Sequence, residues 1–384
     1  MQNQHAHKFP LEGYKVIDFS TLLPGPFATR ILSDAGAAVI KIERPDGGDE
    51  LRSGKPVWGD TCLNFALLNT GKRSIAVNLK SETERERLLP LIREADILVE
   101  QFRPGVLERL GLGYEALREI NPRLIYCSIT GYGQQGPDVQ VAGHDLTYMA
   151  DAGLLSLTRD ASGAPSLPPA LIADLGAGSL PAVINILLAL RYRDIHGEGC
   201  RLDISLTDNL FLFPYWAVAR GEAFGQWPKP GGERLTGGTP RYQIYRARDD
   251  RYIAAAPLEQ RFWDAFCQLI GLDPVWRDDA KEPEGTRMAV AEIIAQHDSA
   301  HWVTVFKDKD VCARVVKTIQ EAASSEHFKA RGIFDRKLSA GASTVSDMRL
   351  PLAPFFSKSS NNERWPSLGE DNGLLNNSAP RQEA

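Results

Sequence analysis

Three side chains in this sequence carry groups that could move a proton or attack a carbonyl carbon: Asp174, His144 and Glu259. Asp174 lies in the segment LIADLGAG (171–178), directly before a long apolar stretch. An aspartate at this place is most often an N-cap, because its carboxylate accepts free backbone N–H groups at a helix start. The glycines favour a functional role, since they let a ligand approach the backbone closely, and a helix N-terminus favours negative charge.

His144 lies in AGHDLTY (142–148), and Glu259 lies in PLEQRF (257–262), at the start of an expected helix. A single histidine is more often structural than catalytic. It becomes a candidate acid or base if it faces Asp174, because imidazole exchanges a proton near neutral pH. For Glu259 the simplest interpretation is a carboxylate that complements the helix dipole.

Basic residues recur near the ends of the expected strands and in the loops that follow them. A solvated surface is the default explanation, and convergence on one phosphate-rich ligand is the more specific one, since Arg and Lys pair strongly with phosphate. The residues are Lys41, Arg44, Lys72, Arg73, Arg103 and Arg109.

Several familiar motifs are absent from the sequence. No GxGxxG follows the first expected strand, and no GxxxxGK[ST], HExxH or GxSxG occurs. A dinucleotide fingerprint, a P-loop, a zinc-protease helix and a nucleophile elbow are therefore unsupported. The five cysteines are scattered without CxxC spacing, which predicts reduced core thiols and no metal site.

The elements that must position these residues alternate in type. Strand signals at 16–19, 38–42, 74–77, 97–99 and 124–129 are separated by helical segments, which predicts an α/β fold with a doubly wound, mostly parallel sheet. Such a sheet binds ligands at the carboxyl ends of its strands, where the turn STLLPGP (20–26) lies. A helix is expected over 176–193, from its apolar period, and a strand over 201–206.

The character of the sequence changes near Gly225. Residues 225–240 are rich in Gly and Pro, and a hairpin is expected from strands at 242–245 and 252–255. Helices are expected at 258–270, 287–296 and about 300–307. We therefore expect a large domain from 1–220 plus 331–384 and a smaller α+β domain from 225–330.

Composition narrows the class of protein. The chain has 384 residues, and 44 basic against 49 acidic residues give a net charge of −5, so no basic footprint for nucleic acid exists. No wholly apolar run approaches the ~18 residues of a membrane span. The polar first residues lack an apolar signal segment, which leads us to expect a cytoplasmic protein with no membrane partner.

Long ordered segments resemble the class III CoA-transferase superfamily, also called CaiB/BaiF, which includes the α-methylacyl-CoA racemase branch. The resemblance runs from Leu11 to about Leu375. It implies acyl-CoA thioesters as substrates, with CoA as part of the substrate and no separate cofactor, and an interlaced homodimer. The segments are LEGYKVIDFSTLLPGPFATRILSDAGAAVIKIERP, NTGKRSIAVNLK, ADILVEQFRPGVLERLGLGYEAL, RLIYCSITGYGQQGP, LIADLGAGSLPAVINILLALRYRDIHGEG and PSLGEDN.

The resemblance implies roles for individual residues. In the transferases, the Asp that matches Asp174 attacks the thioester and becomes covalently acylated. In the racemases, the His that matches His144 and the same Asp exchange the α-proton on opposite faces, with Glu259 matching a carboxylate beside the Asp. The segments GHDLTY, RLTGGTPRYQIY and APLEQRFW favour the racemase. The transferase, a binding protein without turnover and a related lyase-type activity stay as alternatives. Expected CoA contacts are Lys41, Arg44, Lys72, Arg73, Gln101, Arg109 and Tyr148.

Overall fold

The computed structural model describes residues 9–160, 162–347, 349–358 and 364–376. The chain divides into two compact units, which are described separately. The first comprises residues up to Ala152, Pro169–Phe213 and residues from Lys329 onward; the second comprises Gly153–Pro168 and Pro214–Phe328. Compared with the expected domain boundaries, the second unit begins eleven residues earlier than 225 and includes 153–168.

A six-stranded sheet forms the centre of the first unit, with strand order β5-β2-β1-β6-β7-β8. Every pair in it is parallel, which confirms the α/β fold and the doubly wound, mostly parallel sheet. The direction of strand addition reverses between β1 and β6, and ligands bind at such a point in open sheets. The strands are β1 (Lys15–Asp18), β2 (Ala38–Glu43), β5 (Arg73–Ala76), β6 (Ile97–Glu100), β7 (Ile125–Thr130) and β8 (Arg201–Ser205).

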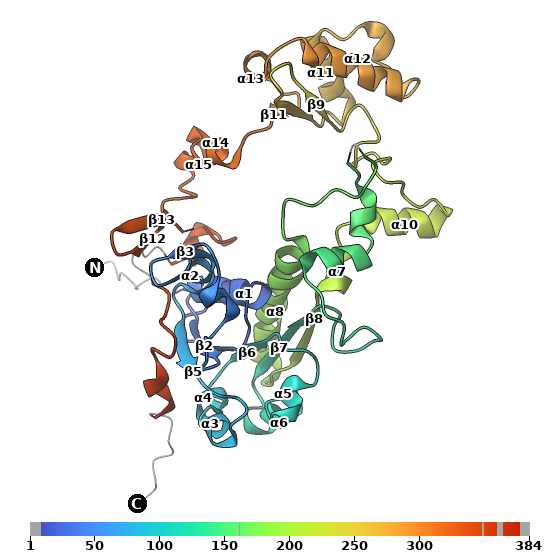
Figure 1. Cartoon of the computed structure of the whole chain (residues 1–384). Coiled ribbons are helices and arrows are strands. Elements are labelled where there is room, and N and C mark those ends of the chain that lie inside the picture. The colour runs from blue at the N-terminus through green and yellow to red at the C-terminus, as the bar shows by residue number, and fades with distance from the viewer. Residues whose placement is uncertain (1–8, 161, 348, 359–363, 377–384) are drawn as a thin grey trace, which may run out of the picture. The chain divides into compact units, whose positions relative to one another are not determined.

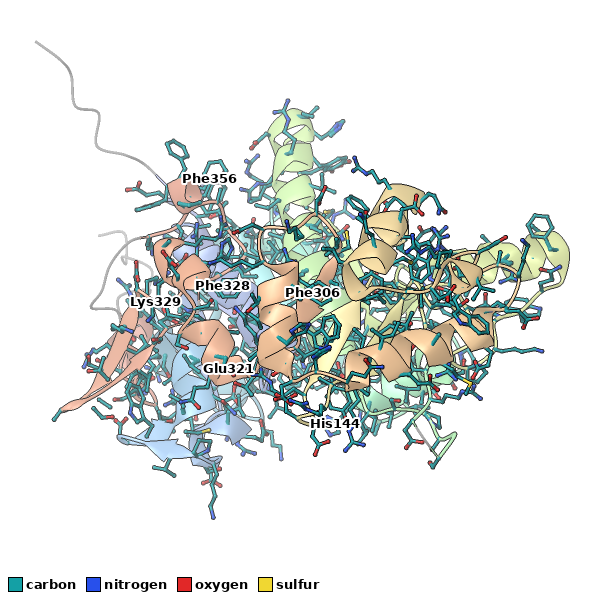
Figure 2. All side chains as sticks on the ribbon, turned by 90° about the horizontal axis from the view of Figure 1, so that it is seen from above. His144, Phe306, Glu321, Phe328, Lys329 and Phe356 are labelled. Atoms are coloured by element: carbon teal, nitrogen blue, oxygen red, sulfur yellow. The ribbon has the colours of Figure 1, made fainter. Side chains whose placement is uncertain are left out.

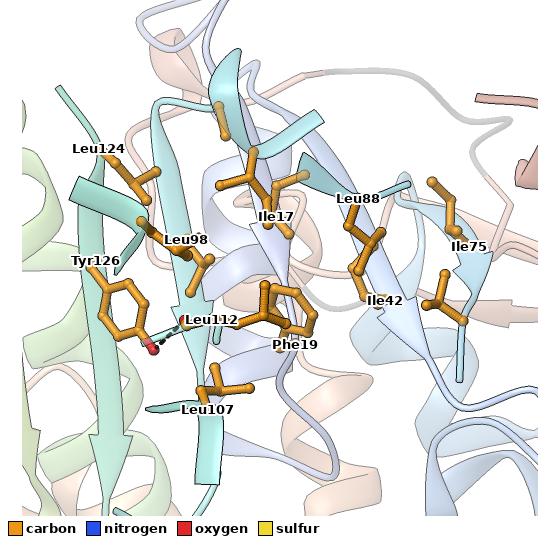
Figure 3. Packing of buried hydrophobic residues seen from close by; sticks show 14 of the residues in the cluster. Ile17, Phe19, Ile42, Ile75, Leu88, Leu98, Leu107, Leu112, Leu124 and Tyr126 are labelled. Atoms are coloured by element: carbon orange, nitrogen blue, oxygen red, sulfur yellow. Dashed lines mark hydrogen bonds between the residues drawn. The ribbon is translucent and has the colours of Figure 1, made fainter. Parts of the chain in front are cut away.

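The two faces of the sheet carry different side chains, because successive residues of a strand point to opposite sides. Ile17, Ile42, Leu98 and Tyr126 point to one face and pack against helices α4 to α6. Figure 3 shows this layer, with the Tyr126 hydroxyl donating to the Leu112 carbonyl at 3.3 Å. Its helices are α4 (Leu89–Arg93), α5 (Val106–Arg109) and α6 (Tyr114–Ile120); α3 (Glu82–Glu86) precedes α4 in the chain.

Helix α1 (Pro24–Asp34) covers the opposite face and contacts α8 (Leu180–His196). All residues of α1 are buried. Figure 1 labels both helices. The first unit also contains α2 (Leu63–Asn69), α7 (Asp145–Asp151), α9 (Leu206–Leu210), the 3-10 turns η1 (Glu50–Ser53), η5 (Pro354–Phe356) and η6 (Asn372–Leu375), and the hairpins β3–β4 (Val57–Trp58, Thr61–Cys62) and β12–β13 (Lys337–Ala340, Ser343–Ser346).

The helix expected over 176–193 differs from the observed one at its start. Residues Ile172–Ser179 form a π-helix, η3, that leads directly into α8. Asp174 is therefore in the first turn of a wide helix and does not precede one. Irregular π turns of this kind are frequent at functional sites.

Only part of the apolar pattern of α8 is buried within the unit. Val183, Ile186 and Leu190 are buried in the unit, while Ile184 and Leu188 of the same pattern are 56% and 64% exposed. By length and composition, Ile172–His196 is one helical stretch that could span a membrane. Core helices of non-membrane proteins satisfy the same test, so this stretch is weak evidence for a membrane span.

The C-terminal segment closes the sheet at β5. The Asp371 N–H donates to the Ser74 carbonyl at 2.8 Å, and the Asn372 side chain accepts the Ala76 N–H at 2.8 Å. An unprotected edge strand invites pairing with another chain. The motif PSLGEDN thus covers this edge.

The second unit is a smaller α+β body. The antiparallel sheet β11-β10-β9 confirms the expected hairpin, and Trp263, Phe266 and Trp302 fill the core beside it. Its elements are η2 (Leu154–Leu157), α10 (Tyr215–Phe224), β9 (Gln243–Arg246), β10 (Tyr252–Ala255), α11 (Gln260–Ile270), η4 (Pro274–Trp276), α12 (Pro283–Ala295), α13 (Ser299–Phe306), β11 (Ala313–Val315) and α14 (Ile319–Ala323); α15 (Glu326–Ala330) spans the boundary to the first unit. Figure 2 labels Phe306, at the end of α13, and Glu321, in α14.

The cysteines are all free thiols. Cys62, Cys127 and Cys267 are buried, as expected of core thiols, whereas Cys200 is half-buried and Cys312 is exposed. The expectation of core thiols is therefore wrong for Cys312, which lies in the loop before β11.

Candidate functional site

A pocket of about 350 Å³ lies at the carboxyl ends of β1, β6 and β7, where the strand order reverses. Four chain segments from the first unit form most of its wall. They are Thr21–Pro24 after β1, Gln101–Pro104 after β6, Ile129–Tyr132 at the end of β7, and Val141–His144 before α7; Val139, Tyr148, Asp174 and Leu206 complete it.

Asp174 is half-buried in the pocket wall. Its backbone N–H donates to Asp145 Oδ1 at 2.9 Å, so a second carboxylate lies beside it. Burial and the charge of Asp145 raise the pKa of Asp174 to about 6, and His144 opposes that shift. Among the described residues, no side chain donates a hydrogen bond to the Asp174 carboxylate. The Asp174 carboxylate is therefore available to interact with a ligand in the pocket.

His144 stands at the N-terminus of α7 and lines the same pocket with an exposed imidazole; it is labelled in Figure 2. Its backbone N–H donates to Thr147 Oγ1 at 2.9 Å. The Tyr148 hydroxyl donates to the Gly143 carbonyl at 2.7 Å, and its ring meets Tyr132 edge-on at 5.5 Å. These contacts fix the loop that carries His144 and bring His144, Tyr148 and Asp174 to one cavity.

Glu259 belongs to the second unit. It is the residue before α11, it is exposed, and its carbonyl accepts the Phe262 and Trp263 N–H groups at 3.0 Å. It is not among the residues that line the pocket of the first unit. Its expected place beside Asp174 stays a prediction.

Lys41 and Lys72, two expected CoA contacts, have fully buried side chains. Lys41 Nζ lies 2.9 Å from Asp49 Oδ2 and donates to the Ser20 carbonyl at 2.6 Å. Lys72 Nζ lies 3.1 Å from Asp18 Oδ2 and also donates to a carbonyl of α1. Both ammonium groups bond to carboxylates and carbonyls inside the protein. This arrangement favours a structural role over a phosphate contact.

Burial disfavours a charged lysine, so these two groups depend on their partners. Burial lowers the pKa of Lys72 to about 8, although Asp18 partly offsets it. For Lys41 the nearby carboxylates of Asp18, Asp49 and Glu43 more than offset burial, and its pKa lies above the ordinary value. Lys41 is therefore firmly a cation.

The other expected CoA contacts are more accessible. The arginines Arg44, Arg73 and Arg109 are exposed, and Arg103, also exposed, lines the pocket. Gln101 lines the pocket too, and its Oε1 accepts the Gly25 N–H at 3.0 Å. A Cβ at position 25 would lie only 2.2 Å from the Ser20 Cβ, so this close approach requires glycine.

Three residues of the site were missed at the level of sequence. Asp145 follows His144 directly and is 6% exposed. Leu22 lines the pocket with a φ of 63°. Asp49 accepts the Leu22 N–H at 3.2 Å. The neighbouring histidine was a usable signal for Asp145. Leu22 lies in the turn STLLPGP (20–26), which the sequence placed at a ligand-binding end of the sheet, but nothing separates it from its neighbours there. Asp49 is one acid among many.

No group of three or more His, Cys, Asp or Glu side chains suited to a metal ion occurs within the described part of the chain. The pocket brings together the Asp174 carboxylate, the His144 imidazole and one basic lining residue, Arg103. That set suits chemistry at a carbonyl or at the carbon next to it.

Comparisons with known proteins give a consistent result. A family model described as CoA-transferase family III matches residues 11–372. Acetyl-CoA:oxalate CoA-transferase of Acetobacter aceti is 35% identical over 335 residues, 85% of each chain. Alpha-methylacyl-CoA racemase of Mus musculus is 33% identical over 365 residues, 94% of this chain and 91% of its own. The crystal structure of a CAIB/BAIF family protein from Brucella suis matches with a TM-score of 0.81 at 28% identity, covering 96% of this chain and 99% of that one.

Proposed function

Because this chain belongs to CoA-transferase family III, we propose that it is a racemase of 2-methyl-branched acyl-CoA thioesters, with His144 and Asp174 as its two proton carriers. The family includes both racemases and CoA-transferases among its matched members. The observation that carries the racemase is the shared pocket of these two unlike bases.

The pKa of Asp174 supports this choice. A two-base racemase needs one protonated and one unprotonated group at working pH, and it must also run with the roles reversed. Burial and Asp145 raise the pKa of Asp174 to about 6. This carboxyl group can therefore both hold and release a proton near neutral pH.

The proposed reaction moves one proton on each face of the α-carbon. One partner, as a free base, removes the α-proton, and the electron pair of the C–H bond passes into the thioester carbonyl to give an enolate. The other partner, protonated at the start, donates its proton to the opposite face. The reverse reaction starts from the other protonation state, so both stereoisomers are substrates.

A CoA-transferase is the second candidate, favoured by the identity to the oxalate CoA-transferase and by the free carboxylate of Asp174. In that reaction the carboxylate attacks the thioester carbonyl and the C–S bond breaks, giving a mixed anhydride and CoA thiolate. The thiolate attacks the aspartyl carbonyl and releases the first carboxylate. An acceptor carboxylate then repeats the sequence in reverse and leaves as the new thioester.

Incubation of an (R)-2-methylacyl-CoA with the protein in deuterated water separates the two reactions. The racemase predicts solvent deuterium at the α-carbon and appearance of the S isomer without any acceptor. The transferase predicts no α-deuterium, and CoA passing to an added carboxylate such as oxalate or succinate. Asp174→Asn is the control, because it should abolish either signal.

We also propose that the protein acts as a homodimer. The exposed apolar side of α8 supports this, since Ile184, Leu187, Leu188 and Ile195 are all between 45% and 64% exposed in the single chain. Large exposed apolar patches mark interaction surfaces. Leu188→Asp should shift the mass in solution from two chains toward one, whereas Arg191→Asp on an exposed polar position of α8 should not.

A further inference from the structure

The loop after β1 carries one unusual residue. Leu22 has a φ of 63° and lines the pocket. This left-handed conformation is uncommon for a residue with a branched side chain and has an energetic cost. Such strain persists only where the surroundings impose it.

A buried ion pair bonds to the backbone beside Leu22. The Leu22 N–H donates to Asp49 Oδ1 at 3.2 Å, and Lys41 Nζ donates to the Ser20 carbonyl at 2.6 Å. Lys41 and Asp49 meet each other at 2.9 Å, with both side chains fully buried. The pair therefore holds the backbone on both sides of Thr21, which itself lines the pocket.

The carboxylate end of this pair is anchored in turn. The Asp49 N–H donates to Glu43 Oε2 at 3.0 Å. Glu43 accepts from Arg52 Nε at 2.7 Å and from Ser74 Oγ at 2.6 Å. Asp49 is thus fixed through residues of β2 and β5, so it can resist relaxation of the loop.

The same loop is connected to the backbone of Asp174. Ser179 Oγ, at the end of η3, lies 2.7 Å from the Pro24 carbonyl oxygen and 3.1 Å from the Asp174 carbonyl oxygen. The chain segment that Lys41 and Asp49 hold therefore ends at the turn that carries Asp174. A shift of the loop after β1 would therefore change the position of the Asp174 backbone and of its carboxylate.

We propose that Lys41 and Asp49 are positioning residues, a buried clamp that keeps the Thr21–Leu23 wall of the pocket in its strained conformation opposite Asp174. The clamp acts on the backbone and does not touch the substrate. Its catalytic consequence rests on the proposed acyl-CoA chemistry, whereas its effect on the loop does not.

Amide hydrogen exchange tests the clamp without turnover. In the full-length protein, the Leu22 amide should exchange at least about 100-fold more slowly than a free amide, because it is bonded to a buried carboxylate. Lys41→Met and Asp49→Ala should each speed that exchange at least tenfold, the second because alanine has no acceptor for the Leu22 N–H. Arg193→Met is the matched control: it breaks another largely buried ion pair of the first unit, with Asp96 at 2.9 Å, and should change Leu22 exchange by less than twofold.

Kinetics tests the consequence. Lys41→Met should lower kcat at least tenfold and change KM by less than threefold, because the loop positions the reacting groups and does not provide the main binding contacts. Arg193→Met should leave both constants within twofold. In a Leu22→Gly background, where positive φ is unstrained, the loss caused by Lys41→Met should shrink at least threefold.

The outcomes are distinct. A Leu22 amide that exchanges freely in the wild-type protein overturns the clamp even if every variant fails to fold. Equal kcat losses from Lys41→Met in the wild-type and Leu22→Gly backgrounds overturn its action through Leu22. A wild-type protein with neither α-deuteration nor CoA transfer overturns the proposed function, while the exchange result still decides whether the clamp exists.

Discussion

Two aspartates of the first unit show how differently one side chain can be used. Asp18, at the end of β1, is fully buried, yet its pKa is lowered to about 2. Burial alone would raise it, but Lys72 and Lys41, with hydrogen bonds from Ser20 and Thr29, more than offset burial. Asp174 is only half-buried, and its pKa is raised to about 6.

The difference in pKa follows from the groups around each carboxylate and not from how deeply the side chain is buried. Asp18 has two cations and two hydroxyl donors, so its charge is stabilised and unavailable. Asp174 has the carboxylate of Asp145 beside it and no side-chain donor among the described residues. The comparison indicates that the charge of Asp18 stabilises the fold, whereas the Asp174 carboxylate faces a pocket without a side-chain hydrogen-bond donor of its own in the described part of the chain. A substitution at Asp174 should therefore reduce turnover, whereas a substitution at Asp18 should reduce the stability of the fold.

The largest effect is expected at Asp174. Asp174→Asn should reduce turnover by about 10⁴-fold, because either chemistry loses its reacting carboxylate, while the melting temperature stays within a few degrees. Steady-state kinetics and thermal unfolding measure the two quantities. Asp194→Asn, an exposed aspartate on α8, is the control. Near-normal turnover of Asp174→Asn would remove Asp174 from the mechanism.

His144 should show the next largest effect and distinguishes the two chemistries. His144→Ala should reduce racemisation by about 10²–10³-fold, since one of two proton carriers is lost. A transferase should retain most of its activity, and its Asp174 should be labelled by hydroxylamine during turnover. His196→Ala, on the exposed end of α8, serves as the control. Full activity of His144→Ala with labelled Asp174 would select the transferase.

Asp18→Asn should instead lower the free energy of unfolding. Removing one partner of a buried pair leaves Lys72 without its counter-charge and costs about 3–5 kcal/mol in the free energy of unfolding. The pKa of Asp18 also gives a sign: its stabilising contribution is present above pH 4 and is lost as the pH falls toward 2. Urea unfolding at pH 7 and pH 3 should show a smaller penalty of Asp18→Asn at pH 3. An equal penalty at both pH values would argue against the ion pair.

The sequence predicted much of the fold, because the strands of a buried parallel sheet are continuous apolar runs bounded by turns. It also singled out His144 and Asp174 as candidates, and the structure brings both to one pocket. It did not predict that Lys41, on β2, and Lys72, directly before β5, are buried, since a lysine looks the same in sequence whether or not a carboxylate lies opposite it. The partners Asp18 and Asp49 are 54 and 8 residues away, and only the fold joins them.

The same distinction between buried and accessible charge applies to the basic residues expected to contact CoA. Arg44→Ala and Arg109→Ala, at exposed positions, should each weaken CoA binding by roughly 1.5–3 kcal/mol if they contact phosphate. Lys72→Ala should act mainly on stability, because its ammonium group is enclosed. Calorimetric titration with CoA measures the first effect, with Arg118→Ala on the exposed side of α6 as the control. Unchanged affinity in both arginine variants would place the phosphates elsewhere.

The smallest expected effect is a shift in the pH dependence of turnover. Asp145 is a cause of the raised pKa of Asp174, second to burial, so Asp145→Asn should move the acid limb of the kcat/KM profile from near pH 6 to a lower pH. A neutral amide removes the like charge while it can still accept the Asp174 N–H. In a transferase, turnover should rise through this limb and stay high, because only the carboxylate attacks. In a racemase, the profile should be bell-shaped, because one proton must be shared between His144 and Asp174. An acid limb that does not move in Asp145→Asn would show that the limb reports a group other than Asp174.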